Sequence, residues 1–133
     1  MAQHYELFYC LELSIRDLIR SRLEESGGAT WWDQLVPQAI KDNAAKNRLK
    51  ETQSGVTPRS ADLLSYTNFG ELGEIIKTNW KLFSDTFTDS RAVEATLARL
   101  NTLRAPIAHC SMLAEDEVLR LRLSLRDWFR LME

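Results

Sequence analysis

The chain has 133 residues, of which 44% are hydrophobic and 27% are charged, and its formal net charge at pH 7 is −2. This balance is typical of one globular domain, here over residues 1–133, and excludes a disordered or fibrous protein. Because the net charge is slightly negative, any site for a polyanion has to be a local positive patch. No apolar run approaches the roughly 18 residues of a membrane span, so we expect no membrane partner.

Cys10 and Cys110 lie far apart and form no C-x-x-C pattern, which predicts two reduced thiols in a cytoplasmic protein. Together with His4 and His109, they also lack the spacing of metal ligands. We therefore predict neither a metal site nor a cofactor.

Apolar residues recur at helical spacing along the first segment, from about Gln3 to Glu25. One face of this predicted helix is apolar and carries Phe8, Leu11, Ile15, Leu18 and Ile19. Another face carries Arg16, Arg20 and Glu24. Gly27 and Gly28 are expected to end the helix, since glycine tolerates the left-handed conformations found there. The adjacent Trp31 and Trp32 then predict a contact across a helix junction.

The next predicted helix has Pro37 in its first turn and continues to Leu49. Its apolar face is weak and it is rich in lysine and arginine, so we expect it at the surface. A loop is predicted from Gln53 to Ser60, because a glycine and a proline interrupt the helical pattern. Residues Ser60–Tyr66 fit either a helical turn or a short extended piece.

Three further helices are predicted in the second half of the chain. The pair Thr67–Asn68 offers N-cap side chains to a helix whose buried stripe extends over Phe69–Phe83. Ser90 is expected to cap the next helix, whose inward residues continue to Leu103, and a last helix is expected over Ala114–Leu131. The fold class is therefore all-α, a single bundle of four to five helices.

Arg104 and His109 stand five residues apart in an otherwise apolar, helix-like run. On a straight helix they would point about 140° apart, at 100° per residue. Pro106, which stands between them in the sequence, removes the hydrogen bond to the carbonyl of Thr102 and bends or restarts the helix. Such a bend, or a second copy of the site across a symmetry axis, would bring the two groups together.

A guanidinium and an imidazole together suit phosphodiester chemistry without a metal. The guanidinium is always positively charged and can stabilise the negative charge that develops on the phosphate oxygens. The imidazole titrates near neutrality and can transfer the proton of the attacking or leaving oxygen. The alternative is that His109 is a hydrogen-bonded core residue.

The basic residues between Arg91 and Arg130 are all arginines, whose forks match phosphate in a bidentate manner. Arg99, Arg120 and Arg122 are the candidate RNA-binding residues of this region. The alternative is that they belong to solvated helix faces and pair with acidic neighbours such as Asp127.

The run Leu103-Arg104-Ala105-Pro106-Ile107-Ala108-His109 resembles the R-x4-6-H signature of the HEPN superfamily (higher eukaryotes and prokaryotes nucleotide-binding domains). Two upstream runs, Tyr66-Thr67-Asn68-Phe69-Gly70-Glu71-Leu72 and Asn79-Trp80-Lys81-Leu82-Phe83, resemble its Swt-type branch. That branch occurs in RNA-quality-control endonucleases and in bacterial defence proteins. The likeness extends over about Leu7 to Phe129.

The resemblance implies a HEPN-like bundle that dimerises through the helix bearing the signature, with Arg104, Pro106 and His109 at the interface. Two Arg–His sets then share one cleft. Active members cut RNA without metal, through attack of the ribose 2′-hydroxyl on the neighbouring phosphate. His109 would be the general acid and base, and Arg104 would stabilise the transition state. The implied partners are RNA, a second copy of the chain, and an antitoxin or a fused effector or sensor domain of a defence system.

Two other functions are compatible with the sequence. Many active members have a polar residue directly after the arginine, whereas this chain has Ala105, which favours a catalytically silent module for interaction, dimerisation or RNA binding. The superfamily's name also suggests nucleotide binding, which a ligand-dependent thermal shift would reveal.

Overall fold

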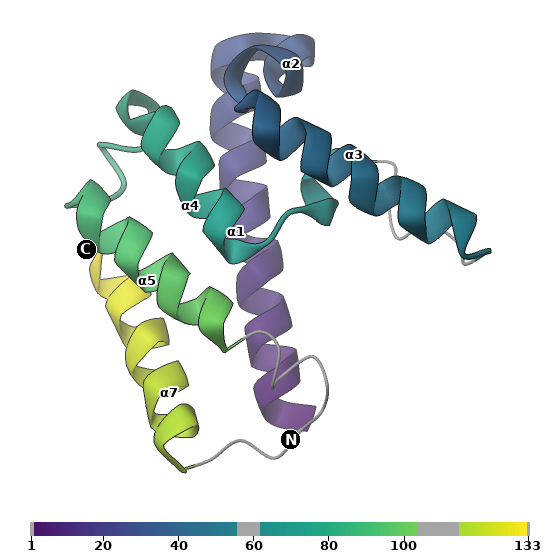
Figure 1. Cartoon of the computed structure of the whole chain (residues 1–133). Coiled ribbons are helices and arrows are strands. Elements are labelled where there is room, and N and C mark those ends of the chain that lie inside the picture. Colours follow the sequence, from purple (N-terminus) through teal and green to yellow (C-terminus); the bar gives the residue numbers. More distant parts are fainter. Residues whose placement is uncertain (1, 56–61, 104–114, 133) are drawn as a thin grey trace.

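Helices make up nearly all of the regular structure of the chain (Figure 1). The computed structural model describes residues 2–55, 62–103 and 115–132, with side chains from 8–55, 62–103 and 118–132. The longer helices are α1 (Ala2–Gly27), α3 (Gln38–Gln53), α4 (Phe69–Thr78), α5 (Ser90–Thr102) and α7 (Glu115–Arg130). Shorter elements are α2 (Trp31–Leu35) and the 3-10 turns η1 (Gly28–Thr30), η2 (Leu63–Tyr66) and η3 (Trp80–Leu82). Because these described ranges contain no strand, the all-α prediction is confirmed.

The apolar stripe of α1 forms one wall of the core, and its fully buried members are Ile15, Ile19 and Leu23. The helix ends at Gly27, where Gly28 adopts a positive φ of 63° that favours glycine. The indoles of Trp31 and Trp32 then meet edge to face with ring centroids 5.7 Å apart. Since both rings pack against the core, the predicted contact at the helix junction is confirmed.

The prediction that Pro37 lies inside the first turn of the next helix is wrong by one residue. Pro37 has a ψ of 142° and serves as the N-cap, so that α3 begins at Gln38. Only Ile40 and Ala44 of this helix are buried, which confirms its surface position. After the segment 56–61, the chain forms η2, which is the helical turn and not the extended alternative.

Helix α4 begins with a reciprocal capping box. Asn68 Oδ1 accepts a hydrogen bond from the backbone N–H of Glu71 at 2.9 Å, and Glu71 Oε1 accepts one from the N–H of Asn68 at 3.1 Å. The neighbouring Thr67 does not cap the helix, because its hydroxyl donates to the carbonyl of Leu64 at 2.6 Å.

The predicted helix over Phe69–Phe83 is wrong in its last third, because α4 ends at Thr78 and η3 follows. The side chain of Asn79 donates to the carbonyl of Ile75 at 3.0 Å and to the carbonyl of Leu35 at 2.9 Å. This bond to a distant segment fixes the helix end, while Phe83 still reaches the core from the following turn.

Helix α5 is capped by Asp89 and not by Ser90, since the Asp89 carboxylate accepts from the N–H of Arg91 at 3.0 Å. Its inward side chains are buried as predicted, namely Val93, Leu97, Leu100 and Leu103. Helix α7 runs antiparallel to α5, because the N–H of Thr88 before α5 donates to the carbonyl of Leu131 after α7 at 3.0 Å.

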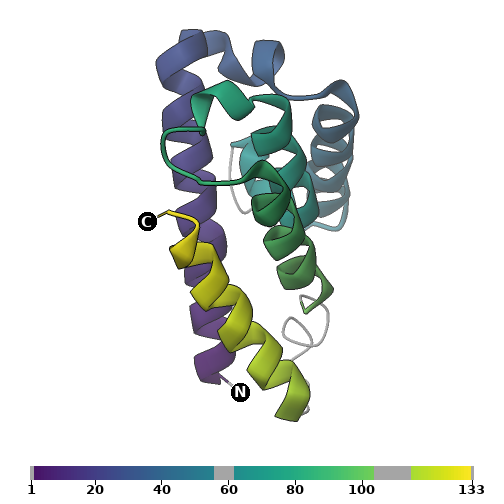
Figure 2. The same cartoon turned by 90° about the vertical axis from the view of Figure 1, so that its left-hand side faces the viewer.

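The two outer helices lie on opposite sides of the bundle. Figures 1 and 2 show α3 on one side of α1, α4 and α5, and α7 on the other. Helix α7 joins the core through Leu121, Leu125 and Trp128. Within the part of the chain that the structure describes, no helix is long and apolar enough to cross a membrane.

Candidate functional site at the end of helix α5

The residues of the predicted signature, Arg104, Pro106 and His109, lie outside the described residues, as does Cys110. Their roles therefore stay predictions. The structure does show the elements that lead into this segment and out of it. Helix α5 ends one residue before Leu103, and α7 begins at Glu115.

The end of α5 is anchored in the core. Leu100 and Leu103 are 0% and 4% exposed, and the N–H of Leu103 donates to the carbonyl of Leu100 at 3.1 Å. Leu103 directly precedes Arg104 in the sequence, so the described chain is anchored in the core up to the residue before the signature arginine.

The start of α4 packs closely against the last turn of α5. A Cβ atom placed on Gly70 would lie 3.3 Å from Asn68 Oδ1 and 3.4 Å from the amide nitrogen of Asn101. A side chain at Gly70 would thus be tight against the cap oxygen of Asn68 and would touch the side chain of Asn101 on α5. Asn101 stands three residues before Arg104, so the capped beginning of α4 supports the turn that leads into the signature.

A buried ion pair holds the chain that precedes α4. Glu12 and Arg16 are 6% and 4% exposed, and their side chains meet at 2.5 Å within α1. The same guanidinium donates to the carbonyl of Thr67. Since Thr67 directly precedes the N-cap Asn68, α1 fixes the place where α4 starts.

This arrangement corrects the expectation for Arg16, which we placed on a charged face of the first helix together with Arg20. Arg20 does lie at the surface, where it contacts Asp17 at 2.8 Å and also reaches Asp62. The pairing of Glu12 and Arg16 could have been found from their i,i+4 spacing. Their burial could not, because it depends on a segment about fifty residues later in the chain.

The three arginines proposed to bind RNA do not form one cluster. Arg99 lies on α5 and contacts Asp127 at 3.2 Å and the hydroxyl of Thr96 at 3.1 Å. Arg120 and Arg122 are exposed on α7, about 10 Å along that helix from the level of Asp127. Arg99 is thus paired with an acidic neighbour, Asp127, on a solvated helix face, and RNA binding by the three arginines stays a prediction.

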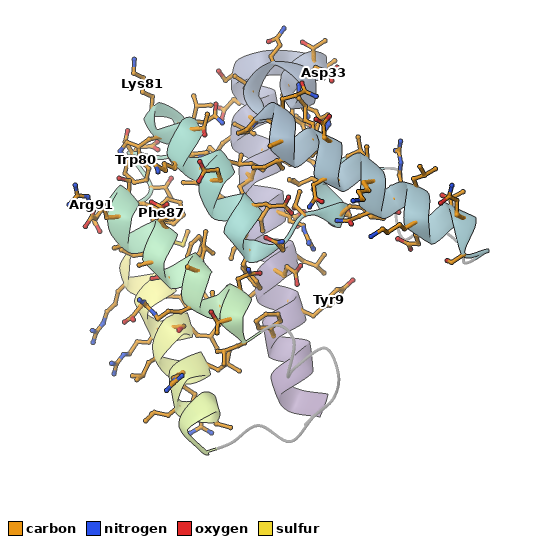
Figure 3. The ribbon with its side chains drawn as sticks, in the orientation of Figure 1. Tyr9, Asp33, Trp80, Lys81, Phe87 and Arg91 are labelled. Carbon is orange, nitrogen blue, oxygen red and sulfur yellow. The ribbon has the colours of Figure 1, made fainter. Side chains whose placement is uncertain are left out.

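A shallow depression of about 350 Å³ lies elsewhere, beside η3 and the last turns of α1. Two of its charged groups pair with each other, because Arg22 donates to Asp85 at 2.8 Å, and Arg22 also donates to the carbonyl of Leu82 at 3.1 Å. The hydrogen bond from Arg22 lowers the pKa of the Asp85 carboxyl below its ordinary value. Figure 3 places Lys81, which also lines the depression, at the end of the molecule opposite the end of α5.

Metal ligands do not gather anywhere among the described residues, where no group of three or more His, Cys, Asp or Glu side chains could hold an ion. Cys10 is exposed and forms no disulfide there.

Comparison with known proteins identifies the family. The family model described as Swt1-like HEPN matches residues 6–133, which is nearly the whole chain and includes the run from Arg104 to His109. Neither curated proteins nor solved structures give a match. Because the family model covers far more than half of the chain and the helical architecture agrees with it, this chain belongs to the Swt1-like HEPN family.

Proposed function

We propose that the chain is a metal-independent endoribonuclease domain whose active site forms at a homodimer cleft. The family match over residues 6–133 carries this proposal, because it includes both members of the R-x4-H signature, Arg104 and His109. Two observations support the proposal: Leu103 is buried in the core, and Asn101 lies against the start of α4. Catalytic groups have to be held in a defined geometry, and these contacts hold the chain just before Arg104.

In the proposed reaction His109 accepts the proton of a ribose 2′-hydroxyl. The 2′-oxygen then forms a bond to the adjacent phosphorus, and the bond from phosphorus to the 5′-oxygen breaks. The same imidazole, which now carries that proton, donates a proton to the departing 5′-oxygen, and Arg104 stabilises the added charge on the phosphate oxygens. The products are a 2′,3′-cyclic phosphate and a 5′-hydroxyl, so neither water nor a metal takes part in the cleavage step.

The direct test is to incubate the purified protein with RNA in EDTA and to analyse the ends of the fragments. We expect cyclic-phosphate ends, and a loss of about 10²-fold or more in rate for Arg104→Ala and for His109→Ala. A 2′-deoxy nucleotide at the cleaved position should abolish cleavage. Arg91→Ala removes an exposed arginine at the start of α5 and serves as the control. Equal cleavage by all variants would refute the proposal.

The second candidate function is a catalytically silent module that dimerises or binds RNA or a partner protein. One observation favours it, namely Ala105, which stands where many active members carry a polar residue. A dimer that binds RNA but leaves it uncut in the same assay, even at high protein concentration, would select this function. The wider assignment to an antitoxin-controlled or defence system applies to either function.

A further inference from the structure

Helix α7 exposes an outward face that combines arginines with large apolar side chains. Away from the core residues Leu121 and Trp128, the side chains of Phe129 and Leu119 are 60% and 56% exposed. Single exposed apolar side chains are common on protein surfaces, whereas several of them gathered on one face are more often found at interaction sites.

The arginines and the phenylalanine follow one strip of the helix. Arg122, Arg126 and Phe129 are spaced i, i+4 and i+7, which places them on the same side, and Arg130 stands beside them. Within residues 8–55, 62–103 and 118–132 these three guanidinium groups form no hydrogen bond or ion pair. We name Arg122, Arg126, Phe129 and Arg130 the α7 strip.

The charge of this part of the helix is strongly positive. Residues 118–132 contain four arginines and one acidic residue, Asp127, which is paired with Arg99 on α5. The net charge of this stretch is therefore +3, in a chain whose total is −2. The other acidic residues of α7 stand in its first turn, before Val118, so the strip itself presents a concentrated positive field.

This charge argues against a second copy of the chain as the occupant. A two-fold interface brings the same patch of both copies together, so the arginines of the strip would face each other. A polyanion is the complementary partner. Arginine forks bind phosphates in a bidentate manner, and an exposed aromatic ring provides a surface on which a nucleic-acid base can stack.

The direction of α7 relates the strip to the proposed cleavage site. Because α7 runs antiparallel to α5, the beginning of α7 lies at the end of the bundle where α5 leads into Arg104 (Figures 1 and 2). From there the 16 residues of α7 extend about 22 Å along the bundle. The α7 strip from Arg122 to Arg130 takes up about 12 Å of this length, which accommodates three to four stacked nucleotides at about 3.4 Å each.

We propose that the α7 strip binds the single-stranded RNA that flanks the cleavage site, with phosphates on Arg122, Arg126 and Arg130 and one base stacked on Phe129. This inference rests on RNA being the substrate in the proposed function, but it does not depend on the chemistry of cleavage. RNA binding by Phe129 and by the arginines of the α7 strip follows neither from the signature nor from the family match.

The test measures fluorescence anisotropy of a labelled single-stranded RNA of about 12 nucleotides, which is longer than the whole of α7. All variants are made in a His109→Ala background, so that the probe is not cut. Arg122→Gln/Arg126→Gln should lower the affinity at least tenfold. It should also reduce the slope of log affinity against log salt by about 1.4, or about 0.7 for each phosphate that the variant no longer neutralises.

Phe129 is tested by two substitutions that separate stacking from apolar bulk. Phe129→Leu should lower the affinity about tenfold without changing the salt slope, whereas Phe129→Trp should preserve the affinity. Lys46→Gln and Leu49→Ala are matched controls, because both positions are exposed on α3, on the other side of the bundle (Figure 1). Both controls should bind like the background protein.

Several results would overturn the inference. The inference is wrong if the strip variants bind RNA as tightly as the background protein. It is also wrong if Lys46→Gln lowers the RNA affinity as much as the strip variants do, because this would indicate non-specific attraction. Unchanged RNA affinity with weakened self-association, or with failure to bind an acidic protein partner, would reassign the face to protein. Binding through the strip without cleavage by the wild-type protein would count only against the proposed nuclease. Cleavage with normal affinity in the strip variants would count only against the inference.

Discussion

The guanidinium of Arg16 in α1 donates to the backbone carbonyl of Thr67, the residue that directly precedes the N-cap of α4. Both residues are buried, and Glu12 pairs with the same guanidinium at 2.5 Å. A charged pair inside an apolar core is costly unless both members remain together. Here it connects the longest helix to the start of α4, on which the last turn of α5 rests.

Glu12→Gln is expected to destabilise the protein by about 3 kcal/mol or more, because it leaves a guanidinium buried without its carboxylate. The double variant Glu12→Leu/Arg16→Met should lose less stability than the sum of the single changes, since no charge then remains buried. Urea unfolding measures both effects. Glu24→Gln, at an exposed position of the same helix, should change the free energy of unfolding by about 0.5 kcal/mol or less. Equal effects at Glu12 and Glu24 would contradict this account.

Asn68→Ala should cost about 1 kcal/mol of unfolding free energy, because it removes the side chain that accepts from the N–H of Glu71. The same change should accelerate hydrogen exchange of that N–H. Asn68→Ser retains an N-cap acceptor and should recover most of the stability. Unchanged exchange at Glu71 in Asn68→Ala would show that the cap does not hold the first turn of α4.

Asp85 provides a pH-dependent prediction. Its pKa is lowered in the folded protein by the hydrogen bond from Arg22, so its ionised form stabilises the fold at pH values above its ordinary pKa of about 3.9. This contribution is lost as the pH falls through the lowered pKa. Arg22→Gln should return the pKa of Asp85 to its ordinary value in an NMR titration, whereas Arg91→Gln should not. A pKa that stays low in Arg22→Gln would exclude Arg22 as the cause.

Asp127→Asn tests whether Arg99 contributes to RNA binding. The ion pair is about half exposed, so its removal should change stability by about 1 kcal/mol or less. If the released Arg99 contacts RNA, the affinity should rise by up to about fivefold. Asp33→Asn removes the same charge at a distant surface position (Figure 3). An equal rise in both variants would show that only net charge matters and that Arg99 makes no contact.

The helices were largely predictable because burial repeats along them with the period of a helix. The end of α4 was not, since Trp80 and Phe83 continue the apolar spacing beyond Asn79. What ends the helix is a hydrogen bond from Asn79 to the carbonyl of Leu35, which only the folded chain brings near. The N-cap of α5 was predicted at Ser90 but lies at Asp89. Both side chains can cap a helix, and a sequence pattern does not distinguish two adjacent positions.

The surroundings of the signature were less predictable than the signature itself. Arg104 and His109 can be identified from residue type and spacing alone. The proximity of Asn101 to Gly70, by contrast, appears only in the folded chain. Arg99 shows the opposite limit. The sequence alone makes any arginine a candidate to bind phosphate. Only the structure shows that the guanidinium of Arg99 forms an ion pair with Asp127 of another helix.

The central claim is that Arg104 and His109 from two chains act in one cleft, and a heterodimer of complementary variants tests it most directly. Arg104→Ala and His109→Ala chains with different tags are co-expressed, and the mixed dimer is isolated and assayed on RNA in EDTA. We predict that each homodimer is inactive and that the mixed dimer cuts, because its cleft retains one arginine and one histidine from different chains. A mixed dimer no more active than either homodimer would contradict the shared cleft.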